Sequence, residues 1–403
     1  MKIAVIGLGF VGLVTSTVLS KHNEIIGIDI DKVKVDKLNN NELYIYEPGL
    51  KELFMENRKN LTFYNDYENA GNADVAFVCV PTPTVDNRID VSYVEDAVIS
   101  LARENGRMTI AIKSTVVPGT ARSLSQKISR SVVSNPEFLR EGSAVNDTVS
   151  PDRIVIGGDD QAALDKISKI WEFTGSSVLK TTNENAELIK YASNSFLAVK
   201  ISFINEIANL CQKIPHTDVE VIARGMGMDH RIGKDFLGAG IGFGGSCFPK
   251  DTRAILSFAQ DKGVPLSIIR DAIDVNNSRI KTAVELIEKT TGNLKGKRIL
   301  LLGLSFKNDT NDLRESKSIE LANELIRLGS VLYAYDPVIK EYPGISMVDN
   351  IDSGNYDCIV ISSEWKEFKS SSLYGAGKNI VDLRRVVDIG MYPNVRAIGI
   401  HYD

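Results

Sequence analysis

The chain opens with a glycine pattern that restricts its fold more than any other feature of the sequence. Gly7, Gly9 and Gly12 follow the apolar run "KIAVI" and lead into a helix-like stretch at 11–21. Such glycines permit a tight turn from strand to helix, and they let backbone N–H groups approach a pyrophosphate. Asp29 ends the next predicted strand, 24–30, where a carboxylate binds ribose hydroxyls and repels a 2′-phosphate. The pattern predicts a dinucleotide-binding unit that prefers NAD to NADP. The alternative is a turn in which the glycines serve only close packing.

The strands and helices predicted for the first 150 residues alternate. Apolar, β-rich runs at 74–80 and 108–114 follow the first two strands, with helical stretches between them. Alternation of this kind favours a parallel sheet with helices on both faces. The carboxyl ends of such strands form the usual ligand-binding edge, so Thr82 and Thr115 are candidates for facing a cofactor. Threonines at ordinary turns, with no cofactor beside them, would give the same sequence pattern.

A faint internal repeat predicts a second unit of the same kind. "KRILLLGLSF" (297–306) resembles the start of the chain, a later strand ends in Asp336, and a third strand follows at 357–363. The sequence therefore predicts an α/β protein with two Rossmann-like doubly wound domains. The expected boundaries are 1–184 for the NAD-binding domain, 185–285 for a central helical dimerisation domain, and 286–403 for the C-terminal domain.

The central region is expected to be helical. Residues 185–214 contain no proline or glycine and are predicted to form one long helix that joins the two end domains. Apolar residues lie on nearly every side, which indicates burial, partly against a second subunit. Lys190 and Asn194 share one face of this helix, and that face continues with apolar residues. A lysine that leads into buried surface needs a partner, so Lys190 is a candidate functional residue.

Composition excludes several classes of function. The net charge is −5 and there is no run of Lys or Arg, which argues against a nucleic-acid partner. Four histidines without ligand spacing argue against a metal site. Four cysteines without a C-x-x-C pair are typical of a reducing compartment. The apolar N-terminus imitates a signal peptide or membrane anchor, but its glycines and lack of a cleavage site favour a cytoplasmic protein without a membrane partner.

The stretch "GIGFGGSCFPKD" (240–251) raises a different question, because it places a thiol among four glycines. Pro249 suits the first turn of a helix, so Cys247 should lie just before a helix N-terminus. The helix dipole and Lys250 would both favour its thiolate, and the glycines would allow a ligand to lie against the backbone. Cys79, Cys211 and Cys358 sit in apolar surroundings and are expected to be core residues. Cys247 is therefore the candidate nucleophile.

A segment at 135–144, "NPEFLREGSA", carries Glu137 and Glu141. Two glutamates four residues apart are most often a solvated helix face, and the pattern alone does not decide otherwise.

An NAD fold with a nucleophilic cysteine suggests oxidation of an alcohol through an aldehyde and a thioester to an acid. In this respect and in its motifs the whole chain resembles the nucleotide-sugar 6-dehydrogenases, the UDP-glucose/GDP-mannose dehydrogenase family. The matching stretches occur in family order from end to end: "IAVIGLGFVGL", "IYEPGL" (45–50), "STVVPGT", "NPEFLREGSA", "ELIKYASNSFLAVKISFINEIA", "GIGFGGSCFPKD" and "GLSFKNDTNDLRES".

The resemblance implies NAD-dependent oxidation of UDP-glucose to UDP-glucuronate, a precursor for polysaccharide biosynthesis, by a homodimer. It implies that Cys247 holds the thiohemiacetal and thioester and that Lys190 and Asn194 stabilise the oxyanion. It further implies that Asp251 orients Lys190 and a water, that Glu137 is the general base for hydrolysis, and that Thr115 positions water near the nicotinamide.

The resemblance also implies two sets of binding residues. The expected NAD contacts are Gly7, Gly9, Val11, Gly12, Asp29, Lys34, Thr82, Thr115, Glu141, Lys250 and Arg314. The expected contacts of the UDP-sugar are Glu137, Phe138, Leu139, Arg140, Glu141, Lys190, Asn194, Phe236, Leu237, Gly238, Ala239, Gly240, Gly244 and Lys307. Arg231 matches an arginine that reaches the substrate of the neighbouring subunit, and the C-terminal domain would hold the UDP.

Two alternatives stay open at this point. The first is the same chemistry on another nucleotide sugar. Relatives that oxidise UDP-N-acetylhexosamines usually carry histidine before the cysteine and lack the following lysine, whereas this chain has Ser246 and Lys250. Against GDP-mannose stands Phe248, where leucine would be expected. The second alternative is a catalytically silent NAD-binding module, which would have lost Cys247, Lys190 or Asp251.

Overall fold

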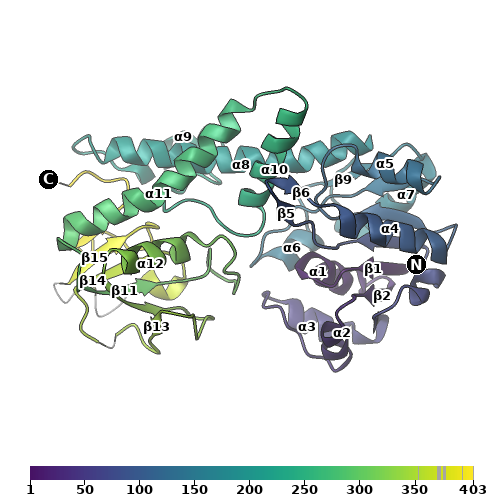
Figure 1. Cartoon of the computed structure of the whole chain (residues 1–403), viewed down its shortest axis with the longest axis horizontal. Coiled ribbons are helices and arrows are strands. Elements are labelled where there is room, and N and C mark those ends of the chain that lie inside the picture. The colour runs from purple at the N-terminus through teal and green to yellow at the C-terminus, as the bar shows by residue number, and fades with distance from the viewer. Residues whose placement is uncertain (353, 370–373, 375–377, 393, 403) are drawn as a thin grey trace. The chain divides into compact units, whose positions relative to one another are not determined.

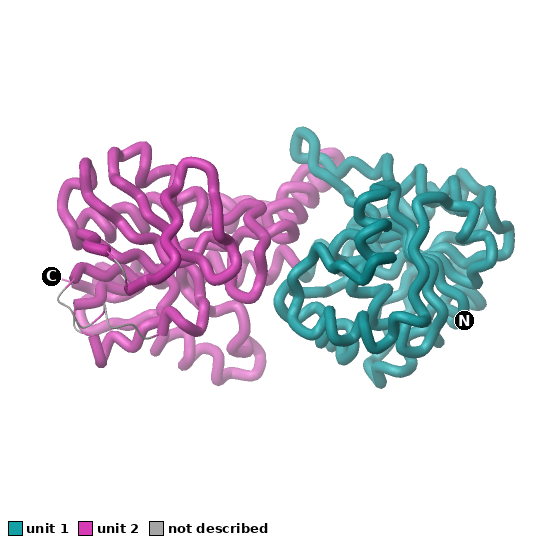
Figure 2. Tube along the Cα trace, turned by 90° about the horizontal axis from the view of Figure 1, so that it is seen from below, with its two compact units in different colours: residues 1–193 teal, residues 194–403 magenta. Residues whose placement is uncertain are grey.

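The computed structural model of this 403-residue chain describes residues 1–352, 354–369, 374, 378–392 and 394–402. The chain forms two compact units, residues 1–193 and 194–403, and each is described by itself (Figure 2). Within the described ranges, no helix is both long and apolar enough to cross a membrane.

Unit 1, with β1, β2 and β9 labelled in Figure 1, is built on a sheet whose strand order is β10-β9-β8-β7-β4-β1-β2-β3 in the described part of the chain. Neighbouring strands are parallel except β8 and β9, which pair antiparallel. The strands are β1 (Lys2–Ile6), β2 (Glu24–Ile28), β3 (Leu61–Tyr64), β4 (Val75–Val78), β7 (Thr109–Ile112), β8 (Val132–Ser134), β9 (Ile154–Gly157) and β10 (Val178–Thr181). A small hairpin of β5 (Thr84–Val85) and β6 (Arg88–Ile89) follows β4.

Helices cover both faces of this sheet because alternate strand residues point to opposite sides. The helices are α1 (Phe10–Leu19), α2 (Lys32–Asn39), α3 (Leu50–Glu56), α4 (Ser92–Glu104), α5 (Thr120–Lys127), α6 (Ala144–Val149) and α7 (Gln161–Ile170). Ile3 and Val5 of β1 belong to one apolar cluster with residues of α1, α3 and α7. Ala4 and Ile6 belong to another with residues of α4 and α5. The predicted two-sided α/β layering is confirmed.

Unit 2 repeats the order of six neighbouring strands of the sheet in unit 1. Its strands are β11 (Arg298–Leu302), β12 (Val331–Tyr335), β13 (Ser346–Met347), β14 (Cys358–Ile361), β15 (Asn379–Asp382) and β16 (Val395–Ala397). Over the residues that are described, their order β13-β12-β11-β14-β15-β16 is the order of β3-β2-β1-β4-β7-β8. This is the doubly wound arrangement of nucleotide-binding folds. The internal repeat predicted from the sequence is confirmed.

The repeat extends to one acidic side chain in each unit. Asp29 follows β2 and accepts a hydrogen bond from Leu8 N at 2.7 Å, and Asp336 follows β12 and accepts one from Leu304 N at 2.8 Å. Asp336 differs in the number of backbone groups that it binds. Its carboxylate also accepts hydrogen bonds from the backbone N–H groups of Ser305, Val338 and Ile339.

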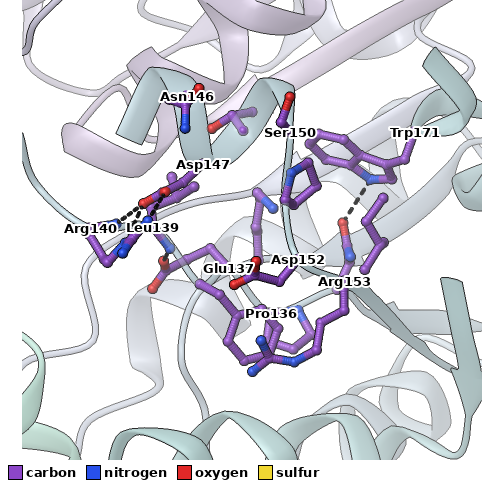
Figure 3. A pocket seen from close by; sticks show the side chains of 16 residues that line it. Pro136, Glu137, Leu139, Arg140, Asn146, Asp147, Ser150, Asp152, Arg153 and Trp171 are labelled. Atoms are coloured by element: carbon purple, nitrogen blue, oxygen red, sulfur yellow. Dashed lines mark hydrogen bonds and ion pairs between the residues drawn. The ribbon is translucent and has the colours of Figure 1, made fainter. Parts of the chain in front are cut away.

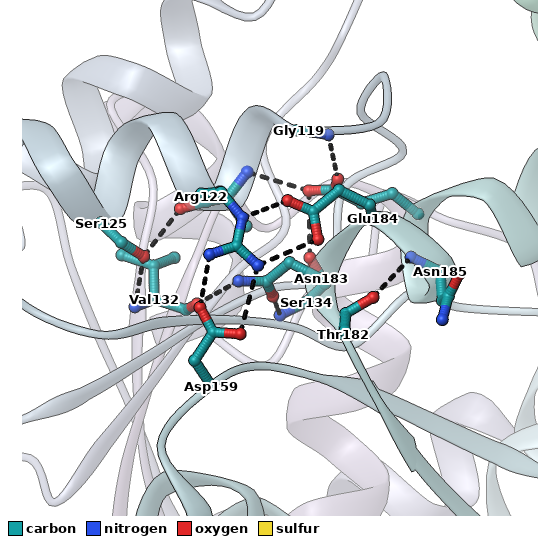
Figure 4. Close-up of polar contacts among 12 residues, drawn as sticks. Gly119, Arg122, Ser125, Val132, Ser134, Asp159, Thr182, Asn183, Glu184 and Asn185 are labelled. Carbon is teal, nitrogen blue, oxygen red and sulfur yellow. Dashed lines mark hydrogen bonds and ion pairs between the residues drawn. The ribbon is translucent and has the colours of Figure 1, made fainter.

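The expected long helix is present as α8 (Asn183–Cys211), which runs across the boundary between the two units. Its first residue is tied to β8, since Asn183 accepts from Ser134 N at 2.9 Å and donates to Val132 O at 3.0 Å (Figure 4). The other helices of unit 2 are α9 (Val219–Gly227), α10 (Phe248–Asp261), α11 (Ser267–Thr291) and α12 (Lys317–Arg327). Residues of α11 and α12 pack with one face of the second sheet.

Several strands were not expected from the sequence. β3 lies between the second and third predicted strands, and β8, β9 and β10 extend the first sheet beyond β7. The runs taken as the third and fourth strands are therefore β4 and β7. In unit 2 the additional strands are β13, β15 and β16. All of them are short, so the local pattern gives little warning and their pairing in the sheet decides the structure.

Candidate functional site

The glycine turn has the geometry that the sequence predicted. Gly9 is the N-cap of α1, directly after β1. A Cβ atom on Gly12 would lie 1.8 Å from Gly7 O, so any larger residue would push the helix away from the turn. A Cβ atom on Gly9, in contrast, would meet no described atom within 4 Å. The turn is tightly packed behind and open at the position where a phosphate would approach.

Asp29 is positioned by the turn itself. Its side chain is buried, Oδ2 accepts from Leu8 N at 2.7 Å, and Oδ1 accepts from Asp31 N at 2.9 Å. Lys34 Nζ lies 3.7 Å from Oδ2. A carboxylate next to the glycine turn is the group that binds an adenosine ribose in dinucleotide folds. These residues fit NAD.

Other residues expected to bind NAD follow strands of the same sheet edge. Thr82 and Thr115 come after β4 and β7, which are the next two strands on one side of β1 in the sheet order β7-β4-β1. Thr82 is buried and Thr115 is half-buried. Ser114, beside Thr115, donates to Val80 O at 2.7 Å and so links the two chain segments that leave these strands.

Glu137 and Lys190 form a buried ion pair in unit 1. Lys190 Nζ donates to Glu137 Oε1 at 2.8 Å, and the two side chains are 3% and 7% exposed. Burial alone raises the pKa of Glu137, but Lys190, Leu139 N and the charge of Lys113 outweigh it, so that the pKa is lowered. Residues 135–140 are not helical. The solvated helix face considered for Glu137 and Glu141 is therefore wrong, because Glu137 packs inward as the partner of Lys190.

Lys113 is a buried cation that was not among the predicted site residues. Its side chain is 5% exposed, and Nζ lies 4.8 Å from the centroid of the Trp171 ring. Burial lowers the pKa of Lys113 and so does the charge of Lys190, while Cys79 and Glu137 act in the opposite direction. A lysine directly after four buried strand residues, Thr109–Ile112, was the available signal.

A cavity of about 160 Å³ in unit 1 borders Glu137 (Figure 3). It is lined by residues 135–140, by 146–148 and 150–154, and by Lys113 and Trp171. Arg140 forms an ion pair with Asp147 at 2.5 Å. Arg153 stacks its guanidinium over the Phe138 ring at 4.0 Å. Cationic and anionic side chains thus surround the predicted substrate-binding segment.

In unit 2, Cys247 lies where the sequence predicted. It is the N-cap of α10, and Pro249 stands in the first turn of that helix. Cys247 is partly exposed, whereas the other three thiols are buried. Burial raises the pKa of Cys79 to about 12 and also raises that of Cys358. Ser246 Oγ lies 3.6 Å from the Cys247 sulfur.

Asp251 organises the first turn of α10. Its side chain is fully buried and accepts from Asn194 Nδ2 at 2.7 Å and from Lys250 Nζ at 2.5 Å. The structure thus joins Asn194, Asp251 and the helix that follows Cys247. The charge of Lys250, which was expected to act on the thiol, is shared with Asp251.

The glycine-rich loop ahead of Cys247 packs against the rest of unit 2. A Cβ atom on Gly244 would lie 2.2 Å from Glu315 O. Phe243 N and O bind the side chain of Asn276, and Gly240 N donates to Asn205 Oδ1 at 2.8 Å. Close packing against Glu315 therefore requires glycine at position 244, and the expected contact of a ligand with the backbone of this loop stays a prediction.

The remaining predicted residues lie on loops of unit 2. Leu237 and Ala239 are buried, and Phe236 has a positive φ of 65°. Lys307 Nζ lies 5.6 Å from the Phe306 ring. Arg314 and Arg231 are exposed and form ion pairs with Asp312 and Asp229, each at 2.6 Å.

Glu187 was also missed, although it lies one turn before Lys190 on α8. Its carboxylate accepts from Gly119 N at 2.6 Å, from Ala121 N at 2.9 Å and from Ser134 Oγ at 3.1 Å. It thereby holds the segment that follows Thr115 against α8. Next to it, Arg122 bridges Glu184 and Asp159 (Figure 4). Nothing in the sequence pattern distinguished Glu187 from a surface glutamate.

Comparison with known proteins assigns the whole architecture. Residues 1–174, 184–278 and 300–389 match the NAD binding, central and UDP binding domains of the UDP-glucose/GDP-mannose dehydrogenase family. UDP-glucose 6-dehydrogenase TuaD of Bacillus subtilis is 41% identical over 92% of this chain and 85% of its own length. UDP-glucose 6-dehydrogenase of Rickettsia felis is 39% identical over 96% of this chain and 93% of its own length.

Solved structures agree with the sequence relatives. A UDP-glucose dehydrogenase from the archaeon Pyrobaculum islandicum superposes with a TM-score of 0.93 at 34% identity, covering 100% of this chain and 98% of its own. A UDP-D-ManNAc dehydrogenase from Pyrococcus horikoshii gives a TM-score of 0.87 at 26% identity and covers 99% of both chains. With three domain matches in order and relatives of this similarity over nearly its full length, the chain belongs to the UDP-glucose/GDP-mannose dehydrogenase family and is an NAD-dependent oxidoreductase.

Proposed function

We propose that this enzyme oxidises UDP-glucose to UDP-glucuronate and consumes two NAD for each sugar. The observation that carries the proposal is the position of Cys247, the one thiol that is not buried, at the N-terminus of a helix whose first turn holds Asp251. Its relatives of about 40% identity are UDP-glucose 6-dehydrogenases, which supports glucose as the sugar.

Each of the proposed site residues has its own role in the two oxidations. NAD, when bound, accepts one hydride from the sugar C6 in each of the two oxidations. Cys247 adds through its sulfur to the aldehyde, which gives a thiohemiacetal that the second oxidation converts to a thioester. Lys190 and Asn194, one turn apart on α8, stabilise the oxyanion, and Asp251 orients Asn194. Their contacts with Glu137 and with Asp251 respectively support these roles.

Hydrolysis completes the proposed cycle. Glu137 takes a proton from water, the water oxygen bonds to C6, and the C6–sulfur bond breaks to release the carboxylate and the Cys247 thiolate. The lowered pKa of Glu137 keeps this carboxylate ionised, and its position beside Lys190 is what supports the role. Thr115 holds water near the nicotinamide.

A substrate panel with the thiol variants tests the proposal. Purified enzyme with NAD should form two NADH per UDP-glucose, and GDP-mannose and UDP-N-acetylhexosamines should give little. Cys247→Ala should abolish acid formation. Cys79→Ala and Cys358→Ala are the matched controls, with intact chemistry and a loss of about 1 kcal/mol of stability. Near-normal UDP-glucuronate from Cys247→Ala would refute the mechanism, and faster oxidation of another nucleotide sugar would refute the substrate.

We also propose that the enzyme works as a homodimer in the cytoplasm and that its product supplies polysaccharide synthesis. Support for the dimer comes from α8, where Phe196, Phe203 and Leu210 are 64%, 44% and 54% exposed at seven-residue spacing. Such a stripe fits a second helix. Phe203→Glu should halve the mass found by sedimentation, and a monomeric wild type would refute the dimer. Arg231 would reach the substrate of the partner.

A further inference from the structure

The segment 44–47, within the motif "LYIYEPGL", has no role in the chemistry proposed above. It crosses unit 1 as an irregular loop between α2 and α3. Two of its side chains, three residues apart, bind two different functional loops of the same unit. One contact is to the glycine turn and the other is to the segment that carries Glu137 and Glu141.

The first contact holds the glycine turn. Tyr44 Oη donates to Leu8 O at 2.5 Å, while Leu8 N donates to Asp29 Oδ2 at 2.7 Å. The backbone carbonyl of Leu8 is thus bound by Tyr44, and its backbone N–H is bound by Asp29, the carboxylate expected to bind the ribose. Burial, with smaller effects of Asp29 and Asp31, raises the pKa of Tyr44, so its hydroxyl keeps the proton that it donates.

The second contact holds the far end of the 137–144 segment. Glu47 is 5% exposed, and its two oxygens accept from Gly142 N and Ala144 N, each at 2.7 Å. The near end of the segment is held by Lys190 through Glu137. Hydrogen bonds of backbone N–H groups to a buried carboxylate are strong. Glu141, expected to contact both NAD and the UDP-sugar, lies between these two anchors.

We infer that Tyr44 and Glu47 are positioning residues that couple the dinucleotide turn to the sugar-nucleotide segment, so that NAD and the UDP moiety bind cooperatively. The inference rests on the proposed function for the identity of the two ligands. Tyr44 and Glu47 are only three residues apart in the chain. A shift of the loop that one of them binds is therefore transmitted through the backbone of 44–47 to the loop that the other binds. Coupling between binding sites is reciprocal, so each ligand should raise the affinity for the other by the same factor.

Binding measurements test the inference without turnover. The Kd of UDP is measured by calorimetry with and without saturating NADH for the wild type, Tyr44→Phe and Glu47→Gln. We expect NADH to tighten UDP binding about fivefold or more in the wild type, within the usual range for coupled sites. In Tyr44→Phe and in Glu47→Gln, the ratio of the UDP Kd values without and with NADH should be close to one. Tyr46→Phe and Glu52→Gln change exposed neighbours of the same types and should keep the wild-type factor.

A role confined to folding gives a different result. It would weaken UDP binding by the same factor with and without NADH, which would overturn the inference. A wild-type coupling factor of one, or an unchanged factor in folded Glu47→Gln, would overturn it as well. If the wild type binds GDP rather than UDP, the proposed substrate fails, and the same comparison with GDP still decides the coupling.

Discussion

Lys190 Nζ lies 2.8 Å from Glu137 Oε1, and this ion pair joins the long helix α8 to a loop residue 53 positions earlier in the chain. Both side chains are almost completely buried. Two charges that leave water together are stable only as a pair, because each one alone would face a large desolvation cost. The pair therefore ties the stability of unit 1 to the two groups proposed for catalysis.

Removal of one partner should be costly. Lys190→Met leaves the Glu137 carboxylate buried opposite a thioether, and we expect a loss of about 3–5 kcal/mol in the free energy of unfolding. Glu137→Leu combined with Lys190→Met removes both charges and should recover a large part of that loss. Urea denaturation of the two variants and the wild type measures this. Equal destabilisation by the single and double changes would contradict the ion-pair account.

Glu137→Gln separates the two halves of the proposed chemistry. The amide cannot take a proton from water, so we expect oxidation to proceed while hydrolysis of the thioester stalls. Intact-protein mass spectrometry after incubation with UDP-glucose and NAD should show the sugar nucleotide attached to the peptide of Cys247. Free UDP-glucuronate at the wild-type rate would exclude Glu137 as the base.

Lys113 should add to the effect of Lys190 on the pH range in which Glu137 works. The cation lowers the pKa of Glu137, so Lys113→Met should raise that pKa. Because the base must be ionised, the acid limb of the pH profile of kcat should then move to higher pH. Lys127→Met removes an exposed lysine of α5 and should leave the profile in place. An unmoved acid limb in Lys113→Met would contradict the coupling between these residues.

Asp29 should determine the choice of cofactor. A 2′-phosphate would lie against its carboxylate, so the wild type should strongly prefer NAD to NADP. Asp29→Ala should narrow the ratio of kcat/KM values for the two cofactors, mainly by improving NADP. Asp66→Ala changes an acidic residue outside the turn and serves as the control. A ratio that Asp29→Ala leaves unchanged would contradict the assignment.

The raised pKa of Glu187 should make the free energy of unfolding depend on pH. Burial raises its pKa from 4.5 to about 7, although Ala121 N, Gly119 N and Ser134 act against the shift. The group therefore stabilises the fold most below pH 4.5, and this contribution of about 3 kcal/mol is lost as the pH rises through 7. Glu187→Gln should flatten the fall in unfolding free energy between pH 5 and about 8. Glu172→Gln, at an exposed site, should not.

Sequence patterns were sufficient wherever the signal is local. The turn at Gly7–Gly12, the helix that starts after Cys247 and the length of α8 all follow from spacing along the chain. Strands such as β3, which alternates buried and exposed residues over only four positions, are too short to be recognised from the pattern and form because neighbouring strands pair with them. The partner of Lys190 could not be named from the pattern, since it comes from a distant loop. Glu47 and Glu187 bind backbone groups, which leave no trace in the sequence.

The two nearly identical sheet orders also bear on the history of the chain. A nucleotide-binding unit that was duplicated would begin with the same acidic residue in both copies, as Asp29 and Asp336 stand today. Backbone N–H groups bind both oxygens of each carboxylate, but two of them bind Asp29 and four bind Asp336. A carboxylate has about four lone-pair sites, so those of Asp336 are filled from within, whereas Asp29 keeps sites for a ribose. The same fold thus holds one carboxylate with acceptor sites left open in unit 1 and one used as an internal brace in unit 2.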